Sequence, residues 1–117
     1  MEVVYYRDRR GHAPVERYVR DLRRHGEARV TATILRMLDL LAEHGPGLGM
    51  PLDRLVDRHA RVYELRPGNH RIAYAEVGGA VVLLHAWRKQ GRRLDPQEAA
   101  TARARLNDWN ERHLEAL

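Results

Sequence analysis

Arginine dominates the chemistry that this sequence can offer. Lys89 is the only lysine among the 21 lysine and arginine residues of the chain. The planar guanidinium fork of arginine can hold a phosphate group through two parallel hydrogen bonds. Any arginine that lies in a concave site is therefore a candidate phosphate ligand, while arginines elsewhere on the surface can be simply solvated.

Two of these arginines, Arg66 and Arg71, are brought together by the turn predicted between them. If residues 67–70 form a four-residue loop, the two side chains face each other on neighbouring strands and project from one face of a sheet. Like charges side by side repel each other, and a phosphate between them removes that repulsion. A three-residue loop would separate them, and arginines at strand ends can also reach into solvent.

Strand register assigns the neighbouring residues to two faces. A two-residue turn at Gly78-Gly79 pairs Val77 with Ala80 and, further along, Arg71 with Ala86. The face of Arg71 then carries Ala73, Ala75, Val82, Leu84 and Ala86, and the opposite face carries Ile72, Tyr74, Leu83 and His85. We expect the bulkier face to pack against helices, and Arg71 to supply charge rather than packing.

His85 and Tyr63 are candidates for acid–base chemistry or base stacking. An imidazole titrates near neutral pH and suits a general base, but the register places His85 opposite Arg71, where a buried core histidine is the competing interpretation. Twist at the strand end could bring it round. The phenol of Tyr63 could donate a proton or stack on a base, although a tyrosine in mid-strand is also typical of a core.

Length, composition and charge limit the function classes. The 117 residues fit one domain, residues 1–117, and the 44% of hydrophobic residues suffice for one core. The net charge of +5 favours a polyanionic partner, although a solvated basic surface has the same composition. No segment approaches the ~18 consecutive apolar residues of a membrane span, so we expect a soluble, cytoplasmic protein without membrane contact.

Metal and thiol chemistry are not expected. The absence of cysteine excludes disulfides, a thiolate nucleophile and cysteine-ligated zinc. The histidines lack a metal-ligand spacing such as His-x-x-x-His. We therefore expect no metal and no cofactor.

Hydrophobic periodicity predicts the elements that must position these side chains. Strands are expected at residues 3–6, 61–66, 70–77 and 80–87. One helix should run from Pro14 to near Gly26 and a second from about Glu27 to Gly45, and a third should open at the capping box Asp95-Pro96-Gln97-Glu98. The order βααβββα predicts an α+β fold, in which a small, mostly antiparallel twisted sheet carries an N-terminal helical hairpin and a C-terminal helix.

Several segments together resemble the phage-related branch of the RelE/HigB toxin superfamily, over most of the chain. They are Val62-Tyr63-Glu64-Leu65-Arg66, Arg71-Ile72 with Tyr74, the Gly78-Gly79 turn, Val82-Leu83-Leu84-His85-Ala86-Trp87, Lys89 and Pro96-x-Glu98. The resemblance implies a RelE-like fold and the toxin of a type II toxin–antitoxin system, a metal-independent endoribonuclease that enters the ribosomal A site and cuts mRNA. It also implies a cognate antitoxin, often a HigA-like helix-turn-helix protein, in a hetero-oligomer with the toxin.

The resemblance suggests roles for individual residues. Arg66 and Arg71 match the family's sheet arginines and Lys89 its post-strand lysine, so all three are expected to bind phosphate and stabilise the transition state, with His85 as the candidate base. RNA-binding candidates are Arg88, Arg92, Arg93 and Tyr63. The basic run 88–93 has one residue more than the family pattern and no tyrosine follows Tyr74, so the proton donor stays open; Lys89 could serve if its surroundings depress its pKa.

Two other functions remain open at this point. A ParE-like toxin on the same fold would target DNA gyrase without cutting RNA, and a basic RNA-binding module would lack catalysis. The presence of Arg66, Arg71 and Lys89 together favours the endoribonuclease, because a gyrase-binding protein has no use for a phosphate clamp on its sheet.

Overall fold

The protein folds around one five-stranded mixed sheet with three helices. The computed structural model describes residues 1–91 and 96–115. The elements follow in the order β1 (Glu2–Tyr5), α1 (Pro14–Arg24), α2 (Ala28–His44), β2 (Asp53–Asp57), β3 (Val62–Leu65), β4 (His70–Val77), β5 (Ala80–Arg88) and α3 (Pro96–Glu115). None of the described helices has the length and apolar content that crossing a bilayer requires.

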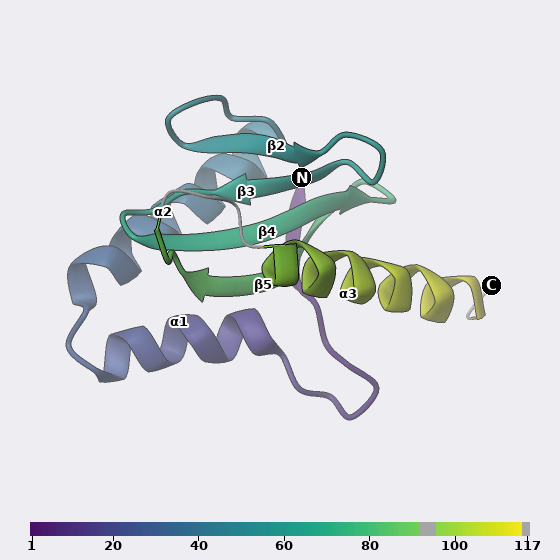
Figure 1. Ribbon diagram of the computed structural model, residues 1–117, viewed down its shortest axis with the longest axis horizontal. Helices are drawn as coiled ribbons and strands as arrows, with labels where there is room; N and C mark the ends of the chain where they lie inside the picture. Colours follow the sequence, from purple (N-terminus) through teal and green to yellow (C-terminus); the bar gives the residue numbers. More distant parts are fainter. Residues whose placement is uncertain (92–95, 116–117) are drawn as a thin grey trace.

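The sheet is the middle layer of three (Figure 1). Its strand order is β1-β5-β4-β3-β2, with β1 parallel to β5 and the other neighbours antiparallel. The helix α2 lies behind the sheet in this view and α3 in front of it, while α1 runs along the β5 side (Figure 1). The predicted α+β class and the mostly antiparallel sheet are confirmed.

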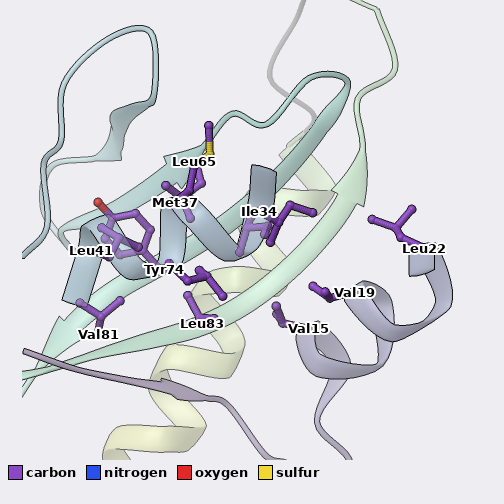
Figure 2. Close-up of a cluster of buried hydrophobic side chains, with 12 residues drawn as sticks. Val15, Val19, Leu22, Ile34, Met37, Leu41, Leu65, Tyr74, Val81 and Leu83 are labelled. Atoms are coloured by element: carbon purple, nitrogen blue, oxygen red, sulfur yellow. The ribbon is translucent and has the colours of Figure 1, made fainter. Parts of the chain in front are cut away.

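The face of the sheet toward α1 and α2, here called the hairpin face, is closed by large apolar side chains. The apolar stripes of the two helices meet the sheet residues Leu65, Ile72, Tyr74 and Leu83, all essentially inaccessible to solvent. Figure 2 shows this cluster, with contributions from α1 (Val15, Val19, Leu22), α2 (Ile34, Met37, Leu41) and the sheet (Leu65, Tyr74, Val81, Leu83). The expectation that the bulkier face packs on the helices is confirmed.

The opposite face, here called the α3 face, has a smaller core. Ala73 and Ala75 of β4 pack with Val82 and Leu84 of β5 against Ala102 and Leu106 of α3. Trp109 is half-buried against the same cluster, on the inward side of α3 as its spacing predicts. Small residues let the helix approach the sheet closely, and they leave the far end of this face to polar side chains.

The edge strand β2 was missing from the predicted elements. Its sequence, Asp53-Arg54-Leu55-Val56-Asp57, has only two consecutive apolar residues and no clear alternation, so it gave no strand signal. Pairing with β3 defines it, together with the buried Asp53 carboxylate. That carboxylate accepts hydrogen bonds from the backbone of Leu48 and Gly49 and from the hydroxyl of Tyr74.

The β4–β5 hairpin has the predicted turn but not the predicted register throughout. Gly78 and Gly79 have φ values of 57° and 80°, and Val77 pairs with Ala80 as expected. A bulge at Leu84 then shifts the register, so that Arg71 pairs with Trp87 rather than with Ala86. The placement of His85 opposite Arg71 is therefore wrong, because a bulge returns the following residues to the other face.

Candidate active site

Arg66 and Arg71 lie side by side on the α3 face. The β3–β4 ladder ends at the pair Leu65–Ile72, so the next positions outward are Arg66 and Arg71. This is the register that a four-residue loop predicts. The two charges influence each other: burial lowers the pKa of Arg71 most, and the positive charge of Arg66 lowers it further.

Arg71 is held in place by the loop that precedes it. Its side chain is almost fully buried, and Nη1 donates hydrogen bonds to the carbonyl oxygens of Gly68 at 2.8 Å and His70 at 2.7 Å. The expectation that Arg71 takes no part in packing is wrong, because the guanidinium closes this loop. Its Nε and Nη2 have no hydrogen-bond partner within residues 1–91 and 96–115, so they are the atoms that an incoming anion can use.

A buried carboxylate organises further arginines around this pair. Glu64 lies two residues from Val62 on the α3 face and is 2% exposed. Its Oε2 accepts a hydrogen bond from Arg54 Nε at 2.8 Å and lies 3.6 Å from Arg66 Nη1. We call Arg54, Arg66 and Arg71 the arginine cluster. One carboxylate among three guanidinium groups leaves a net positive charge at this end of the sheet.

His85 joins the α3 face and is fully engaged there. Its Nε2 lies 2.5 Å from Glu98 Oε2, and Arg105 Nη1 lies 2.9 Å from its Nδ1. A guanidinium can only donate, so Nδ1 must accept and the ring proton must sit on Nε2, facing Glu98. Burial lowers the pKa of His85 more strongly than the Glu98 carboxylate raises it, which favours the neutral ring.

The pairing pattern sets these groups in two rows across the sheet. In the first row, Glu64 pairs with Ala73, and Ala73 pairs with His85. In the second row, two residues along each strand, Arg66 lies next to Arg71, and Arg71 pairs with Trp87. Strands in a sheet are about 4.8 Å apart, so Glu64 and His85 stand about 10 Å apart across an alanine. The Ala73 methyl group between them is buried in the apolar cluster under α3.

Lys89 lies at the same end of the molecule. Its backbone N–H donates to the Asn69 carbonyl at 2.7 Å, which places it beside the loop that Arg71 closes. Side chains alternate along an extended strand, so Lys89 follows His85 and Trp87 on the α3 side. The side chain is half-buried. The three cations that sequence reasoning selected as catalytic thus lie at one end of the sheet, with the Lys89 backbone next to the loop that precedes Arg71.

Two predicted RNA-binding residues lie on the hairpin side instead. Arg88 projects away from the arginine cluster and contacts both carboxylate oxygens of Glu27 at 3.3 Å. Tyr63 stacks on the buried Tyr74, with ring centroids 5.2 Å apart, beneath the loop at Gly47. The predicted RNA-binding residues Arg92 and Arg93 lie outside the described residues.

Sequence reasoning missed four participants in the site. Arg54 was missed because its strand, β2, was not predicted. Glu64 on β3 lies two residues before Arg66, and this spacing alone predicts that both side chains are on the same face. Glu98 was interpreted as part of a capping box, whose Asp95 lies outside the described residues; its Oε2 contacts His85. Glu98 and Arg105 are seven residues apart, a spacing that places both on one helix face.

The arrangement is suited to binding and neutralising a phosphodiester. The arginine cluster and Lys89 supply positive charge and hydrogen-bond donors at one end of the sheet. The Arg105–His85–Glu98 chain supplies a carboxylate between β5 and α3. Within the described residues, no group of three or more histidine, aspartate and glutamate side chains forms a candidate metal site.

A comparison with known families matches most of the chain. The model described as "Phage derived protein Gp49-like (DUF891)" matches residues 20–107, a segment that contains every site residue named above. No curated protein has a significant match to the sequence.

Proposed function

The chain belongs to the phage-derived Gp49-like family, and from that premise we propose that it is the toxin of a type II toxin–antitoxin system. Its activity would be ribosome-dependent cleavage of mRNA without a metal ion. The sequence resemblance to RelE/HigB toxins supports this proposal, and so does the α+β fold with its N-terminal helical hairpin.

One observation carries the proposal: Arg66 and Arg71 stand side by side on the α3 face. Arg71 is buried and fixed through Nη1, while Nε and Nη2 have no partner among the described residues. Glu64 offsets only part of the charge of these guanidinium groups, and a bound anion would offset more of their repulsion. Their position side by side, with donors left over on Arg71, supports a role in holding the scissile phosphate.

The expected chemistry has three requirements. The 2′-hydroxyl of the RNA must lose its proton, the non-bridging phosphate oxygens must be neutralised as charge builds, and the leaving 5′-oxygen must gain a proton. Arg66 and Arg71 would meet the second requirement, with Lys89 beside them. A folded clamp of this kind gains most of its rate from the alignment of its substrate, which the ribosome would supply.

The experiment is controlled expression in bacteria followed by genome-wide mapping of mRNA 5′ ends. We expect growth arrest and new 5′ ends inside translated reading frames. Arg66→Ala should abolish both, because loss of one charge-stabilising donor costs a hundredfold or more in rate. Arg36→Ala removes the same charge from an exposed position on α2 and should change neither.

The outcomes also separate the alternatives. Growth arrest with DNA damage and no new mRNA ends would instead identify a gyrase-directed toxin. Normal growth, combined with RNA binding by the purified protein, would identify a module without catalysis.

We also propose an antitoxin partner that docks at the β1 edge of the sheet, away from the arginine cluster. The strand β1 is an edge of the sheet, and a shallow groove beside it is lined by Met1, Val3, Tyr5, Leu35, Leu38 and Ala42. Apolar edges of this kind are common docking sites for partner segments. Co-purification of the chain with the product of the adjacent gene tests the proposal, and the absence of any stable complex would contradict it.

A further inference from the structure

The Arg105–His85–Glu98 chain assigns the acid–base roles in a way that sequence reasoning did not. Resting on the proposed function, we propose that Glu98 is the general base that takes the proton from the 2′-hydroxyl. His85 and Arg105 are positioning residues that hold the Glu98 carboxylate on the α3 side of the sheet.

His85 is not placed to act as the base. Both ring nitrogens are occupied, Nδ1 by Arg105 and Nε2 by Glu98. The lone pair of His85 Nδ1 points at the Arg105 guanidinium. The same guanidinium also donates to the Leu84 carbonyl at 3.0 Å, and this second contact fixes the Arg105 side chain against β5. A proton could reach Nδ1 only after that anchored contact broke.

The Glu98 carboxylate is better placed to act. Its Oε2 accepts from His85, whereas its Oε1 has no hydrogen-bond partner among the described residues. The side chain is 22% exposed, enough to meet a substrate at the surface. It lies in the first turn of α3, at the positive end of the helix dipole.

The carboxylate is also on the correct side of the molecule. His85 stacks on Trp87 with ring centroids 5.2 Å apart, and Trp87 pairs with Arg71 across the β4–β5 ladder. Glu98 therefore lies on the α3 side of β5, the strand that pairs with β4 and its Arg71. The proposal requires that a phosphate held by Arg71 presents its neighbouring ribose toward this carboxylate.

The step balances without a co-reactant other than water. Glu98 takes the proton of the 2′-hydroxyl, and the 2′-oxygen forms a bond to phosphorus as the bond from phosphorus to the 5′-oxygen breaks. The 5′-oxygen leaves with that electron pair and takes a proton from water, giving a 2′,3′-cyclic phosphate and a 5′-hydroxyl. The protonated Glu98 then returns its proton to solvent.

Charged and titratable neighbours of the pair come from two helices. On α3 the nearest is Arg105, and on α1 it is Tyr18, whose pKa is raised by burial first and then by the charges of Glu27 and Glu98, against the opposing charge of Arg88. Among the described residues, the charged groups in contact with the neutral His85 ring are the Glu98 carboxylate and the Arg105 guanidinium.

The test measures kcat and KM for cleavage of a defined mRNA on programmed ribosomes with the purified full chain. Glu98→Gln keeps the shape and an acceptor for His85 but removes the base, and kcat should fall 10²- to 10⁴-fold with little change in KM. His85→Gln keeps an N–H that can donate to Glu98, and it should lose less than about tenfold and keep the pH–rate profile of the wild type. Glu111→Gln, exposed on the same helix, is the charge-matched control.

A Glu98→Gln variant with near wild-type kcat would overturn the proposal. So would a His85→Gln variant that folds but is as inactive as Glu98→Gln, since His85 would then be the base. The ring tautomer of His85, measured by nitrogen NMR on the wild type, is a readout independent of activity: a proton on Nδ1 would contradict the chain of hydrogen bonds. Failure of the wild type to cut any mRNA, with the Nε2–H tautomer present, would instead sink the proposed function and this assignment with it.

Discussion

The two faces of the central sheet divide stability and chemistry between them. The hairpin face carries large apolar side chains from α1, α2 and the sheet, and its polar groups have partners within the fold, as in the contact of Tyr74 with Asp53. The α3 face is built on alanines and carries Glu64, Arg71 and the His85 chain. A close-packed face supports the sheet rigidly, so that the other face can keep charged groups in fixed positions.

Each face also holds a histidine next to a carboxylate, buried in the case of His70 and half-buried in the case of His85, and the two differ in their second partner. On the hairpin side, the Nδ1 of His70 lies 2.6 Å from the Tyr18 hydroxyl, and its Nε2 lies 3.8 Å from Glu27. On the α3 side, Arg105 fixes the tautomer of His85. A hydroxyl can donate or accept, whereas a guanidinium only donates, so only the α3 side has its proton position dictated by geometry.

The largest effect on stability is expected on the hairpin face, from Asp53→Ala. This carboxylate accepts from two backbone N–H groups and from Tyr74, and its loss leaves one buried and two partly buried donors without a partner. At roughly 1–3 kcal/mol for each unsatisfied donor, the free energy of unfolding should fall by about 3 kcal/mol or more. Denaturant unfolding measures the change.

Asp39→Ala, an exposed position on α2, is the matched control and should change the free energy of unfolding by less than about 0.5 kcal/mol. A small effect of Asp53→Ala would show that the hairpin face does not depend on this buried carboxylate.

The next effect separates the two arginines of the α3 face. Arg66→Ala and Arg71→Ala should each lower ribosome-dependent cleavage a hundredfold or more, about 2.7 kcal/mol in activation free energy. Only Arg71→Ala should also destabilise the fold, by about 1–3 kcal/mol, because Gly68 and His70 lose the donor to their carbonyls. Cleavage assays and denaturant unfolding of the same preparations distinguish the two roles, and equal stability of the two variants would contradict them.

The two histidines make stability depend on pH. Burial, more than the charge of Arg88, lowers the pKa of His70, and burial also lowers that of His85. Both therefore stay neutral in the folded state while the unfolded state takes protons below about pH 6.5, so the free energy of unfolding should fall as the pH drops below that value. Above it, both states are neutral and no contribution is expected.

Denaturant unfolding between about pH 7.5 and 5 measures this slope, since each unit of pKa difference is worth about 1.4 kcal/mol. His70→Gln and His85→Gln should each reduce the slope. A slope unchanged in both variants would show that neither imidazole is held neutral by the fold.

The fold was largely predictable because most of its elements follow a strong periodicity. The stripes Val15–Leu22 and Val30–Leu41 and the Gly78-Gly79 turn each have one stable solution, and they appear as predicted. The strand β2 was not predictable in this way, because its pairing with β3 and the buried Asp53 define it more than its own sequence does. Local patterns carry no signal for an edge strand of that kind.

The site was predictable in one half only. Register brought Arg66 and Arg71 together, since a four-residue loop fixes which positions face each other. A single bulge residue, Leu84, then reversed the predicted face of His85, because side chains alternate with a period of two. The partners that hold His85 come from α3, and a contact between distant elements is not written in the spacing of either one.

The smallest effect is expected from Tyr63→Phe, which tests the division of faces directly. Tyr63 was a candidate RNA-binding residue, but it packs on Tyr74 on the hairpin face, away from the arginine cluster. Removal of its hydroxyl keeps the stacked ring, so cleavage and RNA affinity should stay within about twofold, and the free energy of unfolding should change by less than about 0.5 kcal/mol. Binding to an RNA oligonucleotide and cleavage on ribosomes provide the measurements. A tenfold loss of RNA affinity in a stably folded Tyr63→Phe variant would mean that RNA also contacts the hairpin side, and that the sheet does not separate stability from chemistry.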